Sequence, residues 1–215
     1  MFKKEITLNN NFVNNFYNGS IYDLVFIDLE FWPDFTQLQQ VQRIFGYTIT
    51  RLLKTNSHQY IKIQFLESKG EEKQLIKDIL TDLHILQTKI FIGYNLVNSD
   101  IYCLKKRLRS MRMRSEIKLT TIDLVNHPQK QMYRGGLNGL FEYLEIQVNK
   151  QINGLYFRKN ARKVFARKEN YQQILTTMYD YCLEDARNYF YIVSNWQSKF
   201  AEINKDNFLQ IPLSK

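Results

Sequence analysis

A nearly unbroken apolar stretch at residues 22–31 restricts the fold of this chain more than any other feature. It reads YDLVFIDLEF and is closed by Trp32-Pro33-Asp34. A run that lacks a polar residue at every second position is typical of a strand covered on both faces. The chain must therefore supply other elements to cover it. The 215 residues, of which 44% are hydrophobic, are enough for a sizeable core and exclude a disordered or fibrous chain.

The remaining pattern predicts a mixed α/β sheet with helices packed on it, with three leading strands and then alternating helices and strands. Residues 1–20 are predicted to be an irregular lead-in, 21–205 a single domain and 206–215 a C-terminal tail. Further strands are predicted at 43–53, 60–66, 89–93 and 118–125. Helices are predicted at 71–87, from a cap at Asn98 or Ser99 into the following basic stretch, at 137–146 and at 171–200.

Positive charge is concentrated in one part of the chain. The formal net charge is +9, yet residues 101–170 hold 16 Lys and Arg against 5 Asp and Glu, whereas the rest holds 14 against 16. Two runs, 105–114 and 158–168, contain most of the excess. A pair of solvated helix faces would explain each run by itself. Two such runs in an otherwise slightly acidic chain favour phosphate groups as the partner, and hence a nucleic acid.

The compartment is predicted from what the sequence contains. Two cysteines, Cys103 and Cys182, are too few for a disulfide framework and are expected to be reduced. No stretch reaches the roughly 18 apolar residues of a membrane span, and no apolar run follows the basic start of the chain. We therefore expect a cytoplasmic protein without a membrane partner.

Asp28 and Glu30 are the first candidates for chemistry. Residues two apart in a strand point to the same face, so these two carboxylates lie side by side at the end of the apolar strand. Burying two negative charges together is unfavourable unless a cation lies between them, and oxygen ligands favour Mg²⁺ or Mn²⁺. The alternative is an exposed strand end with both groups in water.

Two later segments supply further candidates. Asp100 follows the strand that ends at Gly93, and open α/β sheets place their sites at such carboxyl ends. Tyr181 and Asp185 are four residues apart on a predicted helix and share one of its faces, where a phenol beside a carboxylate can orient a water. A capping role for Asp100 and an ordinary amphipathic helix for Tyr181 are the alternatives.

Taken in order, these motifs resemble the DEDD (DnaQ-like) superfamily of 3′–5′ exonucleases, which has the ribonuclease H-like fold. The tyrosine in the last motif is similar to the DEDDy branch. The matching residues are Asp28-Leu29-Glu30, Asn95 with Asp100, and Tyr181 with Asp185. Two departures separate this chain from the polymerase-proofreading members: Phe31 follows the glutamate where Thr or Ser is common, and Ser99 precedes Asp100 where an aromatic residue is common.

The resemblance implies a two-metal hydrolysis of DNA or RNA from the 3′ end, releasing nucleoside 5′-monophosphates. Two Mg²⁺ or Mn²⁺ ions would be held by Asp28, Glu30, Asp100 and Asp185. Tyr181 would orient the attacking water. Asn95, Phe31 and Trp32 would contact the terminal nucleotide, although a core or lid role is the alternative for the two aromatic residues.

Two other function classes stay open at this point. One is a non-catalytic nucleic-acid-binding module on the same fold, which the presence of all four acids disfavours. The other is an α/β domain whose basic surface meets an acidic protein or a membrane.

Overall fold

The computed structural model contains one seven-stranded mixed sheet, and it describes all residues except 35–40, 56–57, 127–130, 150–151, 154 and 215. The strand order is β1-β4-β3-β2-β5-β6-β7. β2 pairs antiparallel with β3 and parallel with β5. The strands are β1 (Phe2–Leu8), β2 (Leu24–Asp34), β3 (Val41–Leu52), β4 (Gln59–Phe65), β5 (Ile90–Gly93), β6 (Lys118–Asp123) and β7 (Leu209–Pro212).

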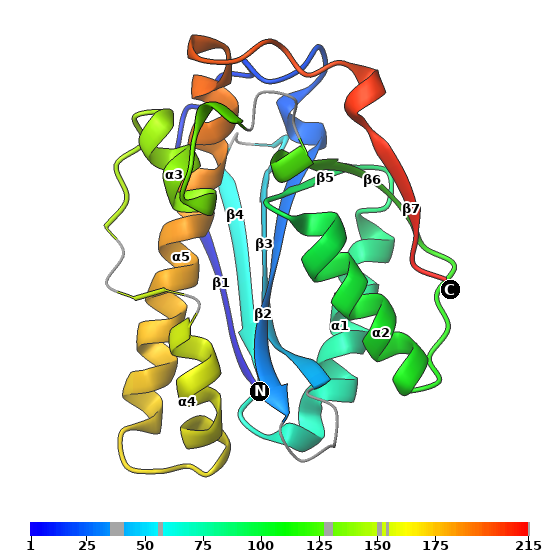
Figure 1. Ribbon diagram of the computed structural model, residues 1–215, viewed down its shortest axis with the longest axis vertical. Coiled ribbons are helices and arrows are strands. Elements are labelled where there is room, and N and C mark those ends of the chain that lie inside the picture. The colour runs from blue at the N-terminus through cyan, green and yellow to red at the C-terminus, as the bar shows by residue number, and fades with distance from the viewer. Residues whose placement is uncertain (35–40, 56–57, 127–130, 150–151, 154, 215) are drawn as a thin grey trace.

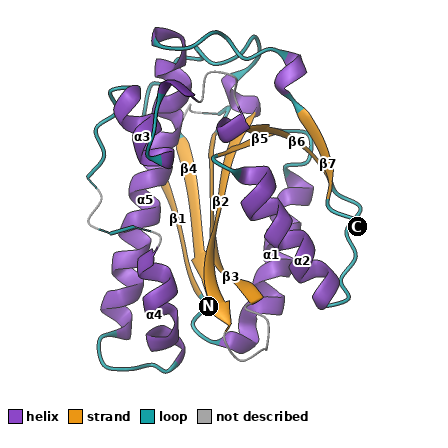
Figure 2. Cartoon of the chain, viewed as in Figure 1, coloured by secondary structure: helices purple, strands orange, loops and turns teal. Residues whose placement is uncertain are grey.

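Helices cover both faces of this sheet, as Figures 1 and 2 show. α1 and α2 pack on one side, and α5 crosses the other side with α4 against it and against β2. The helices are α1 (Glu72–Ile85), α2 (Tyr102–Ser110), α3 (Gly136–Tyr143), α4 (Leu155–Phe165) and α5 (Tyr171–Asn195). A π-helical turn, η3, spans Leu96–Ile101. Short 3-10 turns lie at Ile21–Asp23, Lys69–Glu71, Leu124–Asn126, Trp196–Ser198 and Lys205–Asn207. The mixed sheet flanked by helices is thereby confirmed.

The apolar strand at the centre of the prediction is β2, and both of its faces are buried. Phe26 stacks on Tyr189 of α5 with ring centroids 5.0 Å apart, and it meets Phe190 edge-on at 5.3 Å. Val25 and Leu29, which alternate with Phe26 and Asp28, are also buried. Burial of large apolar side chains on both faces explains why this segment shows no polar alternation.

Two features of β2 prepare it for a site. Its parallel pairing with β5 runs only from Leu24 to Phe26, so the edge beyond Phe26 is not occupied by β5. On the other edge the register with β3 shifts between Glu30 and Phe31, and a bulge of this kind often lies beside an active site. Gly46 lies opposite Glu30, where a Cβ would come 2.2 Å from the Phe65 ring, so only glycine fits.

The two chain ends differ from the prediction. Residues 2–8, within the expected irregular lead-in, form β1, which pairs antiparallel with β4 along the sheet edge. Residues 209–212, within the expected tail, form β7 on the opposite edge against β6. Edge strands expose one face and one set of backbone groups, so they tolerate polar sequences that a central strand does not. The prediction of irregular structure was wrong for residues 2–8, and residues 209–212 of the predicted tail belong to the sheet.

The start of the helix after β5 also differs. A cap at Asn98 or Ser99 was expected, but the chain enters the π-helical turn at Asn95, whose φ of 60° is left-handed. Asparagine tolerates this conformation better than most residues. Asp100 therefore lies inside the π-helical turn and not in the first turn of α2.

The long late helix agrees with the prediction over 171–195 and continues as a 3-10 turn to Ser198. Cys103 and Cys182 are both buried. Among the described helices, none has the length and apolar character needed to cross a membrane.

Candidate active site

Asp28 and Glu30 lie on the face of β2 that α5 covers. The Cys182 thiol of α5 donates a hydrogen bond to Glu30 Oε1 at 3.4 Å, which fixes the direction of the glutamate. Glu30 is 8% exposed, whereas Asp28 is half-buried. The period-two geometry of a strand thus places both carboxylates beside the same helix.

Asp100 contacts the same strand at the edge that β5 leaves unpaired. Its Oδ1 accepts a hydrogen bond of 2.7 Å from the backbone N–H of Leu29, on the part of β2 that β5 does not pair. A fifth carboxylate, Asp123 at the end of β6, accepts hydrogen bonds from the N–H groups of Val97 and Val125. Asp123 thereby holds the turn that carries Asp100.

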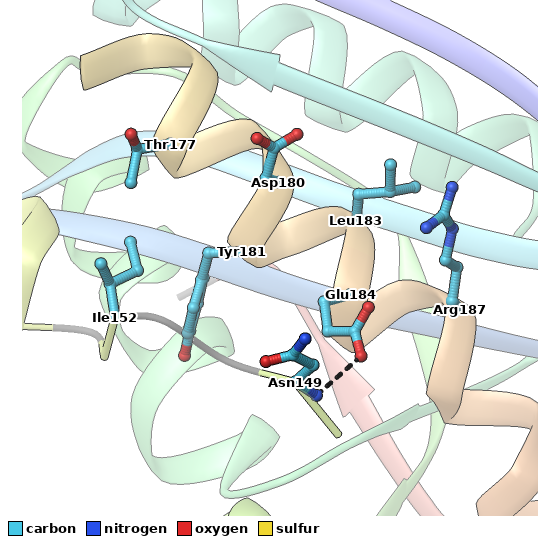
Figure 3. Close-up of a pocket in the computed structure, with 8 residues that line it drawn as sticks. All are labelled: Asn149, Ile152, Thr177, Asp180, Tyr181, Leu183, Glu184 and Arg187. Carbon is cyan, nitrogen blue, oxygen red and sulfur yellow. Dashed lines mark hydrogen bonds between the residues drawn. The ribbon is translucent and has the colours of Figure 1, made fainter. Parts of the chain in front are cut away.

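α5 contributes Asp185 and Tyr181, which lie one helical turn apart. Asp185 is 2% exposed. The Tyr181 ring packs edge-on against Phe157 of α4 at 5.5 Å between centroids. Figure 3 shows Tyr181 and Glu184 extending from the same side of α5 toward Asn149, whose N–H donates to Glu184 at 3.0 Å. The tyrosine forms part of the wall of a small polar cavity between α5 and the segment before α4.

The four carboxylates are close enough to perturb one another. Burial, and then the negative charge of Asp28, raise the pKa of Glu30 well above its ordinary value, and Asp185 and Asp100 add to the shift. Burial and Asp28 likewise raise the pKa of Asp100. These are the shifts expected when acids share a site without a cation between them. The burial and mutual repulsion of these carboxylates also raise the free energy of the folded state at neutral pH.

Tyr181 responds to the same charges. Burial raises its pKa most, and Asp185, Glu30 and Asp28 raise it further. The phenol therefore stays protonated at any physiological pH and is available as a hydrogen-bond donor or acceptor. Asp28 thus influences Tyr181, Glu30 and Asp100 alike, which puts it at the centre of the cluster.

The donor set is suited to a hard divalent cation, since every candidate ligand is a carboxylate oxygen. In the part of the chain that the structure describes, however, no three Asp, Glu, His or Cys side chains are already arranged around a single point that a metal could occupy. The chemistry of the residues, four carboxylates brought to one segment of β2, nevertheless fits a hard divalent cation.

A cavity of about 350 Å³ opens beside Glu30 and is lined by residues of two segments. Phe31 borders it from β2, and Arg158, exposed on α4, borders it from the opposite side. Arg158 begins the second basic run, so the sequence located a cationic segment here without singling out this residue. Asn153 and Leu155 complete the wall and were not predicted.

The two predicted aromatic contacts separate in the structure. Phe31 is half-buried and borders the cavity, as a residue that meets a nucleotide should. Trp32 is 1% exposed and packs edge-on against Phe165 at 5.0 Å, which agrees with the alternative core role and leaves no surface for a base. Asn95 is half-buried at the start of the π-helical turn, five residues before Asp100.

The residues of the first basic run, 105–114, also differ in their surroundings: some are buried and others are exposed. Arg107 is buried and binds Glu72 of α1 through two hydrogen bonds of 2.7 and 2.8 Å, so its charge is compensated inside the protein. The side chains of Lys106 and Arg109 on the same helix are exposed. One of the arginines expected to bind phosphate is thus a structural residue.

Comparison with curated protein sequences gives no match. A family B DNA polymerase from the hyperthermophilic archaeon Pyrobaculum calidifontis is similar in structure, with a TM-score of 0.56 and 14% sequence identity. The similarity covers 79% of this chain and 24% of the polymerase chain, so this chain corresponds to about a quarter of that protein and the likeness concerns the fold.

A family model places the chain more firmly. The model of the RNase H superfamily matches residues 25–197, from the start of β2 to the end of α5. That range contains every candidate carboxylate, and the mixed sheet with flanking helices is consistent with an RNase H-like α/β fold. By sequence and by architecture, the chain belongs to the RNase H superfamily.

Proposed function

We propose that this protein is a metal-dependent 3′–5′ exonuclease of the DEDDy type, which hydrolyses DNA or RNA and releases nucleoside 5′-monophosphates. The observation that carries the proposal is the convergence of Asp28, Glu30, Asp100 and Asp185 from three separate elements onto one segment of β2. Membership of a superfamily of RNase H-like nucleases, which generally use divalent metal ions, supports it.

The four carboxylates would hold two Mg²⁺ or Mn²⁺ ions, with Asp28 between them. When bound, the ions would lower the pKa of an attacking water and stabilise the leaving 3′ oxygen. Without them, the four clustered acids would repel the phosphate diester.

Three other residues act on the substrate in this proposal. Tyr181, kept protonated by its surroundings, orients the attacking water through its hydroxyl. Arg158, across the cavity from Glu30, binds a phosphate of the strand, and Phe31 contacts the terminal base. The Leu29 N–H keeps Asp100 aimed at the site through its 2.7 Å hydrogen bond.

The test is shortening of a 5′-labelled oligonucleotide, with matched DNA and RNA substrates. We expect stepwise shortening in Mg²⁺ or Mn²⁺, none in EDTA, and loss of activity in Asp28→Ala. Glu142→Ala, which removes an exposed acid on α3, is the control and should retain full activity. An Asp28→Ala protein as active as the parent would rule the proposal out.

A non-catalytic nucleic-acid-binding module is the second candidate. The exposed cations of α2 and α4, such as Lys106 and Arg158, would serve such a module without any metal. It requires strand binding that is unaffected by metal, with no degradation over long incubation. The same assay therefore separates the two functions.

A further inference from the structure

The outer face of α2 combines positive charge with an exposed aromatic ring. Tyr102 is 55% exposed, and the Lys106 ammonium lies 5.0 Å from the centre of its ring. Arg109 is exposed one turn further along the helix. We call Tyr102, Lys106 and Arg109 the α2 basic face. Aromatic rings interleaved with cations are the usual surface for a single nucleic-acid strand, because bases stack while phosphates pair with the cations.

Among the residues that the structure describes, no acid forms an ion pair with Lys106 or Arg109. The sequence contains no acid between Asp100 and Glu116. Glu72, the acid that binds α2 through Arg107, is also paired with Arg43, which approaches it at 3.2 Å. Lys106 and Arg109 therefore present their charge outward, where an anion can meet it.

A hollow runs along the same face. A cavity of about 520 Å³ is bordered by the α2 basic face, by Ser110 and by Gln42 of β3. Gln42 pairs with Pro33 of β2, so the far wall of the hollow belongs to the strand pair that continues from Asp28 and Glu30. The hollow thus lies between α2 and the outer end of the strand that carries the candidate carboxylates.

The α2 basic face follows one of the candidate ligands in the chain. Tyr102 is two residues from Asp100, whose carboxylate is bonded to β2. From Tyr102 to Arg109 an α-helix advances about 10 Å, which is the length of one to two extended nucleotides. A strand with its 3′ end at the carboxylates would reach the α2 basic face around the edge of β2 that β5 leaves unpaired, where Asp100 is bonded.

We infer that the α2 basic face is a second contact for the substrate strand, binding single-stranded nucleic acid a few nucleotides upstream of the 3′ end. Tyr102 stacks on a base, and Lys106 and Arg109 bind backbone phosphates. This inference rests on the proposed exonuclease function. It adds that strand length beyond the terminal nucleotides contributes to binding.

Binding is tested without cleavage. Fluorescence anisotropy of 5′-labelled dT12 and U12 is measured in EDTA over a series of salt concentrations. We expect Lys106→Gln with Arg109→Gln to weaken binding and to lower the slope of log K against log salt by about 1.4, since each phosphate contact on a single strand contributes about 0.7. Tyr102→Ala should weaken binding about tenfold without changing that slope.

A charge-matched control identifies the surface. Lys73→Gln with Lys77→Gln removes two exposed cations from α1 and should leave the salt slope unchanged. All variants alter exposed side chains, and their thermal midpoints are measured to exclude unfolding. Equal binding of the Lys106/Arg109 variant and the parent would overturn the inference and would instead indicate that this face binds another class of partner, such as an acidic protein.

Kinetics separate the failure of this inference from failure of the proposed function. The Lys106/Arg109 variant should raise KM for a 12-nucleotide strand while leaving kcat/KM for a dinucleotide unchanged. A dinucleotide is too short to reach α2. An active parent whose KM for both substrates is unaffected by the variant would overturn the second contact alone, whereas an inactive parent that still loses oligonucleotide affinity in the variant would overturn only the exonuclease proposal.

Discussion

Two buried glutamates, one on each side of the sheet, are treated in opposite ways. Glu72 on α1 is 2% exposed and receives two hydrogen bonds from Arg107, a third from Arg43 and a fourth from the Ile44 N–H. Glu30 on β2 is 8% exposed, receives one weak hydrogen bond from Cys182, and faces other carboxylates.

The difference shows how burial alone fails to distinguish a structural acid from a functional one. A carboxylate that pairs with an arginine through two hydrogen bonds has its charge compensated, so a further ligand would stabilise it little. A buried carboxylate that faces other carboxylates has an uncompensated charge. Only protonation or a bound cation reduces the repulsion between them. Four predictions test this contrast, from the largest effect to the smallest.

Glu30→Gln should separate activity from stability. If the proposed exonuclease is correct, activity falls by about 10³-fold or more, because one metal ligand is lost. The thermal midpoint in EDTA should rise by a few degrees, since a neutral amide removes repulsion with Asp28 and keeps an acceptor for Cys182. A nuclease assay and thermal melting in EDTA measure both; a lowered midpoint would contradict the proposed repulsion.

Glu72→Gln should do the reverse. Removing one partner of the buried pair leaves the Arg107 charge uncompensated and should lower the free energy of unfolding by about 3–5 kcal/mol. Urea unfolding measures the loss. Replacing both partners, with Glu72→Leu and Arg107→Met, should cost less than either single change. Equal losses in the single and double variants would mean that the pair does not act as a unit.

A divalent metal ion should stabilise the protein through Asp28, Glu30, Asp100 and Asp185, and not through Glu72. At a Mg²⁺ or Mn²⁺ concentration of 100 times its dissociation constant, the folded state gains about 2.7 kcal/mol. The thermal midpoint of the parent should rise accordingly, and Asp28→Asn should abolish most of the rise. Glu72→Gln is the control and should keep it. The same metal-induced rise in Asp28→Asn would place the ion elsewhere.

The pH dependence of stability without metal should carry the same signature. The folded-state pKa of Glu30 is raised above its ordinary 4.5, so the folded protein binds more protons than the unfolded chain above that pH. Stability in EDTA therefore falls as pH rises from about 4.5 through the raised pKa, by at most about 1.4 kcal/mol per pH unit for one group.

The comparison with Glu30→Gln isolates this contribution. Urea unfolding from pH 5 to pH 8 in EDTA should show a smaller decline in the variant than in the parent. Saturating metal should also reduce the decline in the parent, since it favours the ionised carboxylates. Parallel pH profiles for parent and variant would show that Glu30 does not take up the extra proton.

The sequence predicted the elements whose pattern of apolar side chains reflects which faces are buried. β2 was recognisable because both of its faces are buried, and α1 because its leucines and isoleucines follow the helical period. Residue type and spacing are sufficient for these two elements because they reflect local burial. A shared site for Asp28, Asp100 and Asp185 was predicted by the family resemblance that these residues carry.

Other parts depend on contacts that spacing does not encode. β1 is a strand because β4 offers it a partner, although Lys3, Lys4 and Glu5 give it a polar sequence. α4 was described only as a basic run, because its charges hide an apolar stripe in which Phe157 and Val164 are buried. Arg107 could not be told apart from its exposed neighbours, because Glu72 lies 35 residues away in the sequence.

The π-helical turn at Leu96–Ile101 gives the spacing between Asn95 and Asp100 a meaning of its own. A π turn accommodates one residue more than an α turn, and each residue rotates the chain about 100° around the helix axis. Deleting a single residue from 96–99 would point the carboxylate away from the Leu29 N–H while leaving α2 intact. In relatives of this chain, four residues between the asparagine and the aspartate should mark the wide turn, and three should mark its absence. The number of residues between this asparagine and aspartate therefore predicts the direction of the aspartate side chain.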